Sequence, residues 1–308
     1  MELLQLQYFQ TVARLEHMTK AAEELRVAQP ALSKTIARLE SDLGVPLFDR
    51  TNRQIRLNAF GRAFLGKVDT ALAALEEGRK EVADLAGMER GSIHLATNTL
   101  HRVTHSLGVF RARHPEVNFR IVQVAPSSTE EMVRLLESGE ADLCFTAAPL
   151  DRPGIREIAV LNAEILLAVP PGHRFEGTGS IRLADAAGEP FIEYRAGHPF
   201  RGANDAFCQK AGIRRNVVCE VEEPSALAEL VQAGLGVALV PGRQEAKQPF
   251  WQVRIEEPSW HRAFNLAWQD KRYLSLAARR FRDFLVEYFA EPPKTSAAPA
   301  SSRLDAAE

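Results

Sequence analysis

Residues 19–50 read TKAAEELRVAQPALSKTIARLESDLGVPLFDR, and this stretch decides the fold of the first part of the chain. In its second half, apolar residues recur at spacings of four, three and four, which is typical of a helix that buries one face. These residues are Leu32, Ile36, Leu39 and Leu43. We expect the helix to begin at Gln29–Pro30, because proline suits a first helical turn, and to end at Gly44. A shorter helix should precede it, with Thr19 as the N-cap.

Two helices joined by a tight turn predict a helix-turn-helix, whose second helix fits the major groove of DNA. Gln29 can make a bidentate contact to adenine, and Ser33 and Lys34 follow about one turn later. The alternative interpretation is a small three-helix bundle without a ligand, since helical periodicity alone is also typical of such a bundle.

Two short apolar segments, residues 46–48 and 54–57, flank a turn-rich basic segment and predict a small hairpin, or wing. Between residues 50 and 67 the chain has five Lys or Arg and no Asp or Glu, although its formal net charge is −2. Such a run attracts phosphate, and Arg53 on the wing is placed to enter a minor groove. The other interpretation is a solvated loop and helix face, because a charge run is weak evidence without a motif.

The motifs TKAAEEL (19–25), VAQPALSK (27–34) and PLFDR (46–50) are similar to the DNA-binding domain of the LysR-type transcriptional regulators. This resemblance is closest over about the first sixty residues, and the later order of elements is compatible with it. One departure is LNAFG at 57–61, where the family usually has Leu-Thr-x-x-Gly, but Asn58 can still cap the next helix.

Within this family, the opening residues MELLQLQYF most resemble the glutamate-synthase regulators of Gram-positive bacteria. The resemblance implies that a helix face and the wing bind double-stranded DNA at a pseudo-palindrome, with half-sites about one helical turn apart or a multiple of it. It also implies a dimer that associates into a tetramer, and RNA polymerase is a further candidate partner. The predicted DNA-binding residues are Thr19, Lys20, Gln29, Pro30, Ala31, Ser33, Lys34, Arg38, Arg50 and Arg53.

A long linker helix is expected after Asn58, and it carries a heptad-like apolar seam. The seam positions are Leu65, Val68, Leu72, Leu75, Arg79, Val82 and Ala86. Such a seam needs a partner, and we favour the linker helix of a second copy of the chain. The alternative is that the seam packs on its own domain.

From residue 91 the sequence alternates between short strands and helices, which predicts a parallel-rich α/β arrangement. Strands are expected at 92–96, 118–124, 143–146, 164–169, 217–221, 237–240 and 264–268. Helices are expected at 100–114, 129–138, 199–211, 225–233 and 274–288. The family resemblance implies that this part is an effector-binding domain, built as two α/β lobes like a type II periplasmic binding protein.

The expected fold class is therefore α/β with an all-α-type N-terminal module. Its parts are a winged helix-turn-helix at 1–58, a linker and dimerisation helix at 59–88, and an effector-binding domain at 91–290. Lobe one is expected at 91–162 with 265–290, and lobe two at 163–264. Residues 291–308 lack apolar periodicity, which predicts a disordered tail.

In such a domain, ligands lie at strand C-termini and helix N-termini, where free N–H groups favour anions. The predicted effector-binding residues are Thr97, Thr99, Ser128, Thr129, Thr146, Arg195, Arg201 and Ser225. Thr99 and Thr129 match the family's effector-contacting hydroxyl positions. The alternative is that the hydroxyls are ordinary helix caps and the arginines are solvated.

Motifs of common enzymes are missing: the sequence has no GxSxG, HExxH, P-loop or GxGxxG in a strand–helix setting. We therefore expect that the protein is not an enzyme and that it binds neither a metal nor a cofactor. A free-standing solute-binding protein is another alternative, but the N-terminus lacks the basic and apolar regions of a signal peptide. No stretch approaches about 18 apolar residues, so we expect no membrane span and a cytoplasmic protein.

The three cysteines raise the alternative of a thiol-based redox sensor, because some LysR-type regulators sense peroxide through a cysteine pair. Cys208 and Cys219 lie eleven positions apart. However, Cys144 and Cys219 occupy apolar runs, where cysteine behaves as a small hydrophobe, and neither has an obvious setting that lowers a thiol pKa. Without a CxxC motif or a disulfide framework, a reducing compartment is the simpler expectation.

Overall fold

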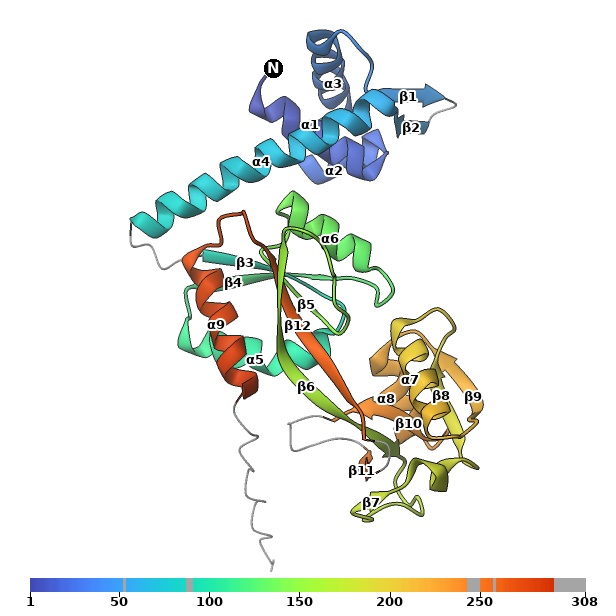
Figure 1. Ribbon diagram of the computed structural model, residues 1–308. Helices are drawn as coiled ribbons and strands as arrows, with labels where there is room; N and C mark the ends of the chain where they lie inside the picture. The colour runs from blue at the N-terminus through green and yellow to red at the C-terminus, as the bar shows by residue number, and fades with distance from the viewer. Residues whose placement is uncertain (52–53, 87–90, 243–249, 257–258, 291–308) are drawn as a thin grey trace, which may run out of the picture.

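A computed structural model describes residues 1–51, 54–86, 91–242, 250–256 and 259–290. They form an N-terminal helical module, a long linker helix and a two-lobed C-terminal domain (Figure 1). The predicted contact residue Arg53, the last residues of the predicted linker segment and the predicted tail lie outside the described residues.

The N-terminal module consists of three helices and a hairpin. They are α1 (Leu3–Leu15), α2 (Met18–Leu25), α3 (Gln29–Leu43), β1 (Phe48–Thr51) and β2 (Gln54–Leu57). The predicted apolar stripe of α3 is buried against Phe9 of α1. β1 and β2 pair antiparallel and form the predicted wing. Gly44, at a φ of 73°, ends α3 in the left-handed conformation that glycine favours.

The start of α2 differs from the prediction. The helix begins at Met18, and its N-cap is His17, whose Nδ1 accepts a hydrogen bond from the backbone N–H of Lys20 at 3.3 Å. Thr19 therefore lies inside the helix, and the prediction that it caps α2 was wrong. The cap lies two residues earlier than expected, because the His17 ring can accept a hydrogen bond from one of the free N–H groups of the first turn.

Helix α4 (Ala59–Leu85) is the predicted linker, and Asn58 caps it by accepting a hydrogen bond from Gly61 N–H at 2.8 Å. Its apolar seam divides in two. Val68 is buried in the core of the N-terminal module, so this half follows the alternative in which the seam packs on its own domain. Farther along, Leu75 and Val82 are 55% and 65% exposed.

The sheet of lobe one has β3 at its centre, with a parallel strand on each side of it. Its elements are β3 (Gly91–Thr97), α5 (Leu100–Arg113), β4 (Val117–Gln123), α6 (Thr129–Ser138), β5 (Leu143–Thr146) and α9 (Leu276–Ala290). Each of these elements overlaps a strand or helix expected from the sequence.

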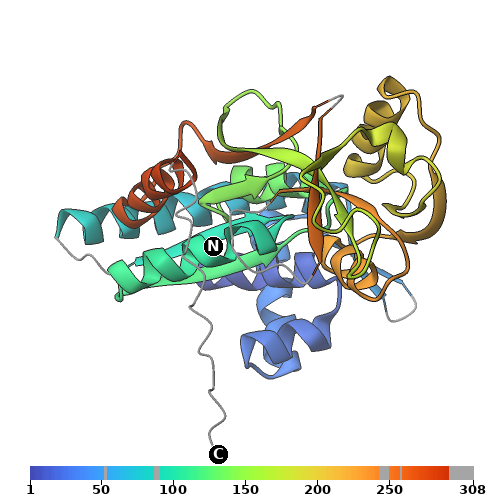
Figure 2. The ribbon, with the colours of Figure 1, turned by 90° about the horizontal axis from the view of Figure 1, so that it is seen from below.

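Two long antiparallel strands, β6 (Ile155–Val169) and β12 (His261–Gln269), run from one lobe to the other (Figures 1 and 2). Their pairing shifts between Phe264 and Asn265. The lobe boundaries expected from the sequence fall inside these two strands. The strand expected at 164–169 begins nine residues earlier, at Ile155.

Lobe two lies beyond one end of lobe one, in yellow to orange in both views (Figures 1 and 2). Its elements are β7 (Ser180–Ile181), the 3-10 helix η1 (Leu183–Ala186), β8 (Pro190–Tyr194), α7 (Pro199–Lys210), β9 (Asn216–Val221), α8 (Pro224–Gln232), β10 (Ala238–Pro241) and β11 (Trp251–Ile255). The strands β7, β8 and β11 were not predicted.

The expectation of a parallel-rich sheet needs correction. β8 and β9 are parallel to each other, and β4 and β5 are both parallel to β3. However, β10 and β11 both pair antiparallel with β6, and β12 pairs antiparallel with β5 and β6. The sheet is therefore mixed, because the chain crosses between the lobes on antiparallel strands.

Candidate nucleic-acid interface and interlobe pocket

The polar face of α3 is open to solvent, which places most of the predicted DNA-binding residues on one surface. The exposed ones on α2 and α3 are Thr19, Lys20, Gln29, Pro30, Ala31, Lys34 and Arg38, and Ser33 is half-buried. Arg38 also lies 3.5 Å from the Glu2 carboxylate, an exposed ion pair that contributes little to stability. The N-terminal end of α3 therefore presents small and polar side chains without a covering element.

Glu40 fixes the wing relative to α3. Its Oε1 accepts hydrogen bonds from the backbone N–H groups of Leu47 and Phe48 at 2.8 and 3.3 Å, and its Oε2 pairs with Arg50 at 3.0 Å. The Glu40 carboxylate thus connects the base of the wing to α3. Sequence reasoning missed this role, because Glu40 lies on the polar face of α3 and looks like an ordinary solvated residue.

A pocket lies between the two lobes and encloses about 450 Å³, including space open to solvent. Lobe one and β12 contribute Thr99, His101, Arg102 and Phe264. Lobe two contributes Tyr194, Phe200, Pro224, Ala228, Val240, Pro241, Phe250 and Gln252. The pocket is therefore lined mainly by aromatic and aliphatic side chains, with a few polar groups from both lobes.

Three predicted effector-binding residues meet at the ends of β3 and β5. Thr99 lines the pocket, and its backbone N–H donates to Thr97 Oγ1 at 3.0 Å. Thr146 Oγ1 donates to the carbonyl of Ala148 at 2.9 Å and lies 3.4 Å from Asn98 Nδ2. Thr99 occupies the N-cap position of α5, yet its side chain caps no N–H group in the described structure.

Of the predicted effector-binding residues, Thr99 belongs to the described pocket lining, and the others lie outside it. Ser128 and Thr129 begin α6, and Ser225 is exposed at the start of α8. Arg195 pairs with Glu222 at 3.4 Å. Arg201 pairs with Asp205 and Glu220 at 3.1 and 2.8 Å. The structure thus brings the threonines of lobe one together, while both arginines are engaged by carboxylates.

Two family models match this chain and together cover most of it. Residues 3–62 match the bacterial regulatory helix-turn-helix proteins of the lysR family, and residues 86–290 match the LysR substrate binding domain. The chain is a LysR-type transcriptional regulator. This membership confirms the predicted family and fold class, and it agrees with the prediction that the protein is not an enzyme.

Known relatives align over nearly the whole regulator. The uncharacterized transcriptional regulator YybE of Bacillus subtilis is 36% identical over 94% of this chain and all of its own length. The transcriptional dual regulator GltC of Bacillus subtilis is 30% identical over 94% of this chain and 98% of its own length. The crystal structure of CbnR, a LysR family regulator, has a TM-score of 0.68 at 23% identity and covers 94% of this chain and 100% of its own.

Two buried polar side chains pack against the outer side of the residues that line the interlobe pocket. The Cζ of Arg262 lies 4.0 Å from the centre of the Phe200 ring, and burial lowers the pKa of Arg262 to about 10. His198 stacks on Tyr194 with ring centres 4.3 Å apart, and burial, with Arg262 nearby, lowers the pKa of His198 to about 4. Sequence reasoning missed Arg262 and His198, because nothing local marks them as neighbours.

Arg102 connects the two lobes directly beside the pocket. Its guanidinium donates to the carbonyls of Pro241 and Gly242 at 3.4 and 2.8 Å, and it lies 4.9 Å from the centre of the Phe264 ring. Since Arg102 belongs to α5 and the two carbonyls lie at the end of β10 and just after it, these hydrogen bonds depend on how closely the lobes approach each other.

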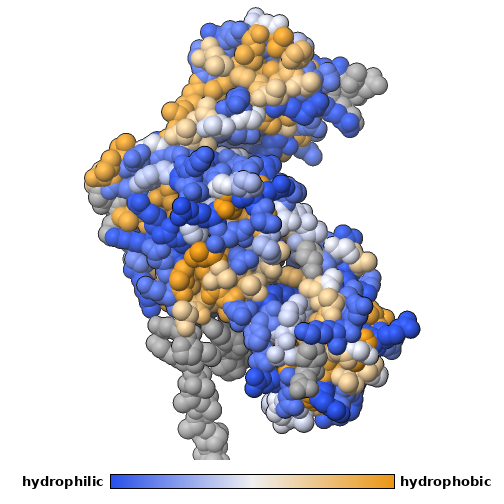
Figure 3. Space-filling view, in the orientation of Figure 1, coloured by the Kyte–Doolittle hydropathy of each residue, from blue (hydrophilic) through white to orange (hydrophobic). Residues whose placement is uncertain are grey.

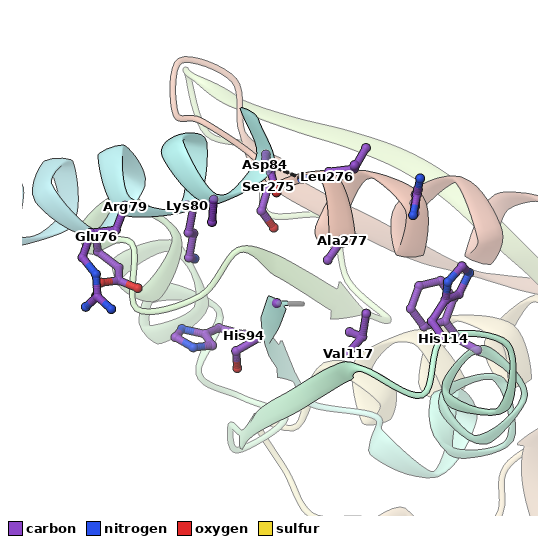
Figure 4. Close-up of a pocket in the computed structure, with 15 residues that line it drawn as sticks. Glu76, Arg79, Lys80, Asp84, His94, His114, Val117, Ser275, Leu276 and Ala277 are labelled. Carbon is purple, nitrogen blue, oxygen red and sulfur yellow. Dashed lines mark hydrogen bonds and ion pairs between the residues drawn. The ribbon is translucent and has the colours of Figure 1, made fainter. Parts of the chain in front are cut away.

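The second half of α4 is bonded to lobe one through one polar face. Lys80 pairs with Asp142 at 2.6 Å, Glu77 pairs with Arg272, and Asp84 Oδ2 accepts hydrogen bonds from Tyr273 Oη and Leu276 N–H at 2.7 and 2.6 Å. Figure 4 shows Lys80 and Asp84 on α4 facing the cavity beside these contacts, with Leu276 opposite Asp84. This cavity encloses about 850 Å³, including space open to solvent.

The cysteines of the regulator do not favour a redox role. Cys144 and Cys208 are buried and Cys219 is half-buried, and all three are free thiols. Burial raises the pKa of Cys208 to about 12 and that of Cys144 higher still, so neither is a reactive thiolate.

Over the described ranges, no group of three or more His, Cys, Asp or Glu is arranged to hold a metal ion, and no helix is long and apolar enough to span a membrane.

Proposed function

We propose that this regulator binds a promoter pseudo-palindrome as a dimer or tetramer and responds to a small anionic effector bound between its lobes. The observation that carries the DNA-binding part is the exposed polar face of α3 beside a wing that Glu40 holds in place. A helix presented in this way reads base edges, and the wing contacts the backbone or a minor groove. Arg53 belongs to this proposal because it lies on the wing segment.

Self-association is supported by apolar side chains that remain exposed in the single chain. On α4 they are Leu75, Val82 and Leu85, and on α1 they are Leu3 and Leu4. Figure 3 shows apolar residues gathered over the N-terminal helices and α4. We propose that a second copy covers this surface, which would give the operator-binding unit the two-fold symmetry of a pseudo-palindrome.

The effector part of the proposal is supported by the pocket between the lobes. Thr99 lines its lobe-one side, and Thr97 and Thr146 lie close by at the ends of β3 and β5. Helix α5 begins at the pocket, and the N–H groups of its first turn favour anions. Ser128 and Thr129, together with the lobe-two residues Arg195, Arg201 and Ser225, would join the site if the lobes close further. Effector binding would then shift the population toward the closed arrangement and change operator binding in the cytoplasm.

A genomic pull-down tests the proposed function. Full-length protein is mixed with fragmented genomic DNA at near-physiological salt, and the retained fragments are sequenced. We expect a few sites that share a pseudo-palindrome, and we expect Lys34→Ala to lower their retention by tenfold or more. Lys210→Ala, which changes a lysine at the end of α7, is the matched control. Equal retention of all DNA with a steep salt dependence would show that α3 does not read bases.

A further inference from the structure

The interlobe pocket combines an aromatic lining with an absence of negative charge. Tyr194, Phe200, Phe250 and Phe264 supply four aromatic rings. In the part of the chain that the structure describes, no Asp or Glu lines the pocket. A ligand with a flat or cyclic apolar body would bury its surface against these rings. The charged and polar side chains behind the rings would then determine which charge on the ligand is favoured.

Arg262 is a buried cation that has no counter-ion among the described residues. It is 5% exposed, its hydrogen bond goes to the neutral amide oxygen of Asn204 at 3.2 Å, and within the described residues no carboxylate lies within salt-bridge distance of it. Its Nη1 has no hydrogen-bond partner there. A buried charge is normally paired, because leaving it alone in a low-dielectric interior is costly.

His198 adds a second unused donor to the same cluster. Its Nδ1 accepts a hydrogen bond from the backbone N–H of Phe200 at 3.0 Å, so the neutral ring carries its proton on Nε2. Nε2 is buried and has no partner among the described residues. His198 and Arg262 pack against Tyr194 and Phe200, two residues of the pocket wall.

Lobe one contributes a third unsatisfied group. Thr99 is buried, it lines the pocket, and its Oγ1 has no hydrogen-bond partner in the described structure. Buried polar atoms in proteins are almost always satisfied, and exceptions need an explanation such as a missing ligand. Here one exception, Thr99, lines the pocket, and two others, His198 and Arg262, lie directly behind its Tyr194–Phe200 wall.

We infer that Arg262 is the specificity-determining cation of the effector site, and that the effector is a small carboxylic acid with a ring-shaped apolar body. The inference rests on the proposed function of the interlobe pocket. The ring lies among the pocket aromatics, and the carboxylate is held near the Tyr194–Phe200 wall, with Thr99 as a donor from lobe one. Arg262 stands one ring behind this wall, so it acts on the carboxylate through its field.

Three probes of equal shape but different charge test this inference. Benzoate, benzamide and benzylamine are titrated against the full-length protein, and the rise in Tm gives an apparent affinity for each. A full charge roughly 8 Å away, at an effective dielectric near 20, changes affinity about ten- to thirtyfold. We therefore expect benzoate to bind about tenfold or more tightly than benzamide, and benzylamine to bind more weakly still.

Variants assign the preference to Arg262. Arg262→Met should bring the apparent affinities for benzoate and benzamide within a factor of two or three, while Arg262→Lys, which keeps the charge, should retain most of the difference. Arg182→Met is the matched control, because Arg182 lies in lobe two, is exposed and already pairs with Asp185. If Arg262→Met does not fold, Arg262→Lys and Thr99→Val still test the site, and Thr99→Val should weaken benzoate binding.

Several outcomes would overturn the inference. They are equal binding of benzoate and benzamide by the natural sequence, loss of the preference in Arg182→Met but not in Arg262→Met, and no rise in Tm with any probe at millimolar concentration. Each of these is compatible with specific operator binding in the genomic pull-down. Failure of the effector assignment is thus distinguishable from failure of the proposed function.

Discussion

Removing the Lys80 ammonium should loosen the linker helix from lobe one. Lys80 Nζ lies 2.6 Å from Asp142 Oδ1, and the two side chains are only 15% and 7% exposed. Breaking a buried ion pair by removing one partner costs about 3–5 kcal/mol, because the other charge stays buried. Asp142 keeps the hydrogen bond from His94 N–H at 2.8 Å, so we expect about 2–3 kcal/mol for Lys80→Ala.

This loss should be local and measurable by hydrogen exchange. A cost of about 2–3 kcal/mol raises the population of the open interface by roughly 30- to 150-fold, and exchange in the last turns of α4 should accelerate by a similar factor. Arg79→Ala is the control, since Arg79 is 82% exposed and its pair with Glu76 should contribute well under about 1 kcal/mol. If α4 exchanges equally fast in the two variants, the ion pair does not hold the linker helix to lobe one.

Two further predictions concern the wing and the pocket. Glu40→Ala removes the acceptor of two wing N–H groups and the partner of Arg50, so it should destabilise the N-terminal module by about 1–3 kcal/mol in denaturant titrations; an equal loss in Glu23→Ala would argue against this role. Burial lowers the pKa of His198 from 6.5 to about 4, so the unfolded chain takes up a proton in this range before the folded chain does, and stability falls as the pH drops from 6.5 to 4. Between pH 7 and pH 5 we expect the free energy of unfolding to fall by up to about 2 kcal/mol, and we expect this fall to be missing in His198→Gln. The same pH dependence of stability in the natural sequence and in His198→Gln would refute the assignment.

The N-terminal module could be predicted closely because its signals are local. The stripe on α3, its proline start and its glycine end all lie within sixteen residues of each other, and each is a rule about near neighbours along the chain. The strands of the C-terminal domain were harder. In β6, charged residues such as Glu157 and Glu164 interrupt the apolar pattern, because the strand has to pass through both lobes. In β8, the buried Glu193 hides the apolar run, and its partner Arg215 lies far away in sequence.

The two candidate sites differ in the same way. The proposed DNA-binding face lies mainly on α2 and α3, so the sequence places its residues together without knowledge of the tertiary fold. The interlobe pocket draws residues from Thr99 to Phe264, and only the fold brings them together. Sequence reasoning offered Arg195 and Arg201 as effector ligands, and the structure pairs Arg201 with Asp205, one helical turn farther along α7. Arg262 is a buried arginine with no carboxylate in salt-bridge distance among the described residues, and such a charge can be recognised only when its surroundings in the fold are known.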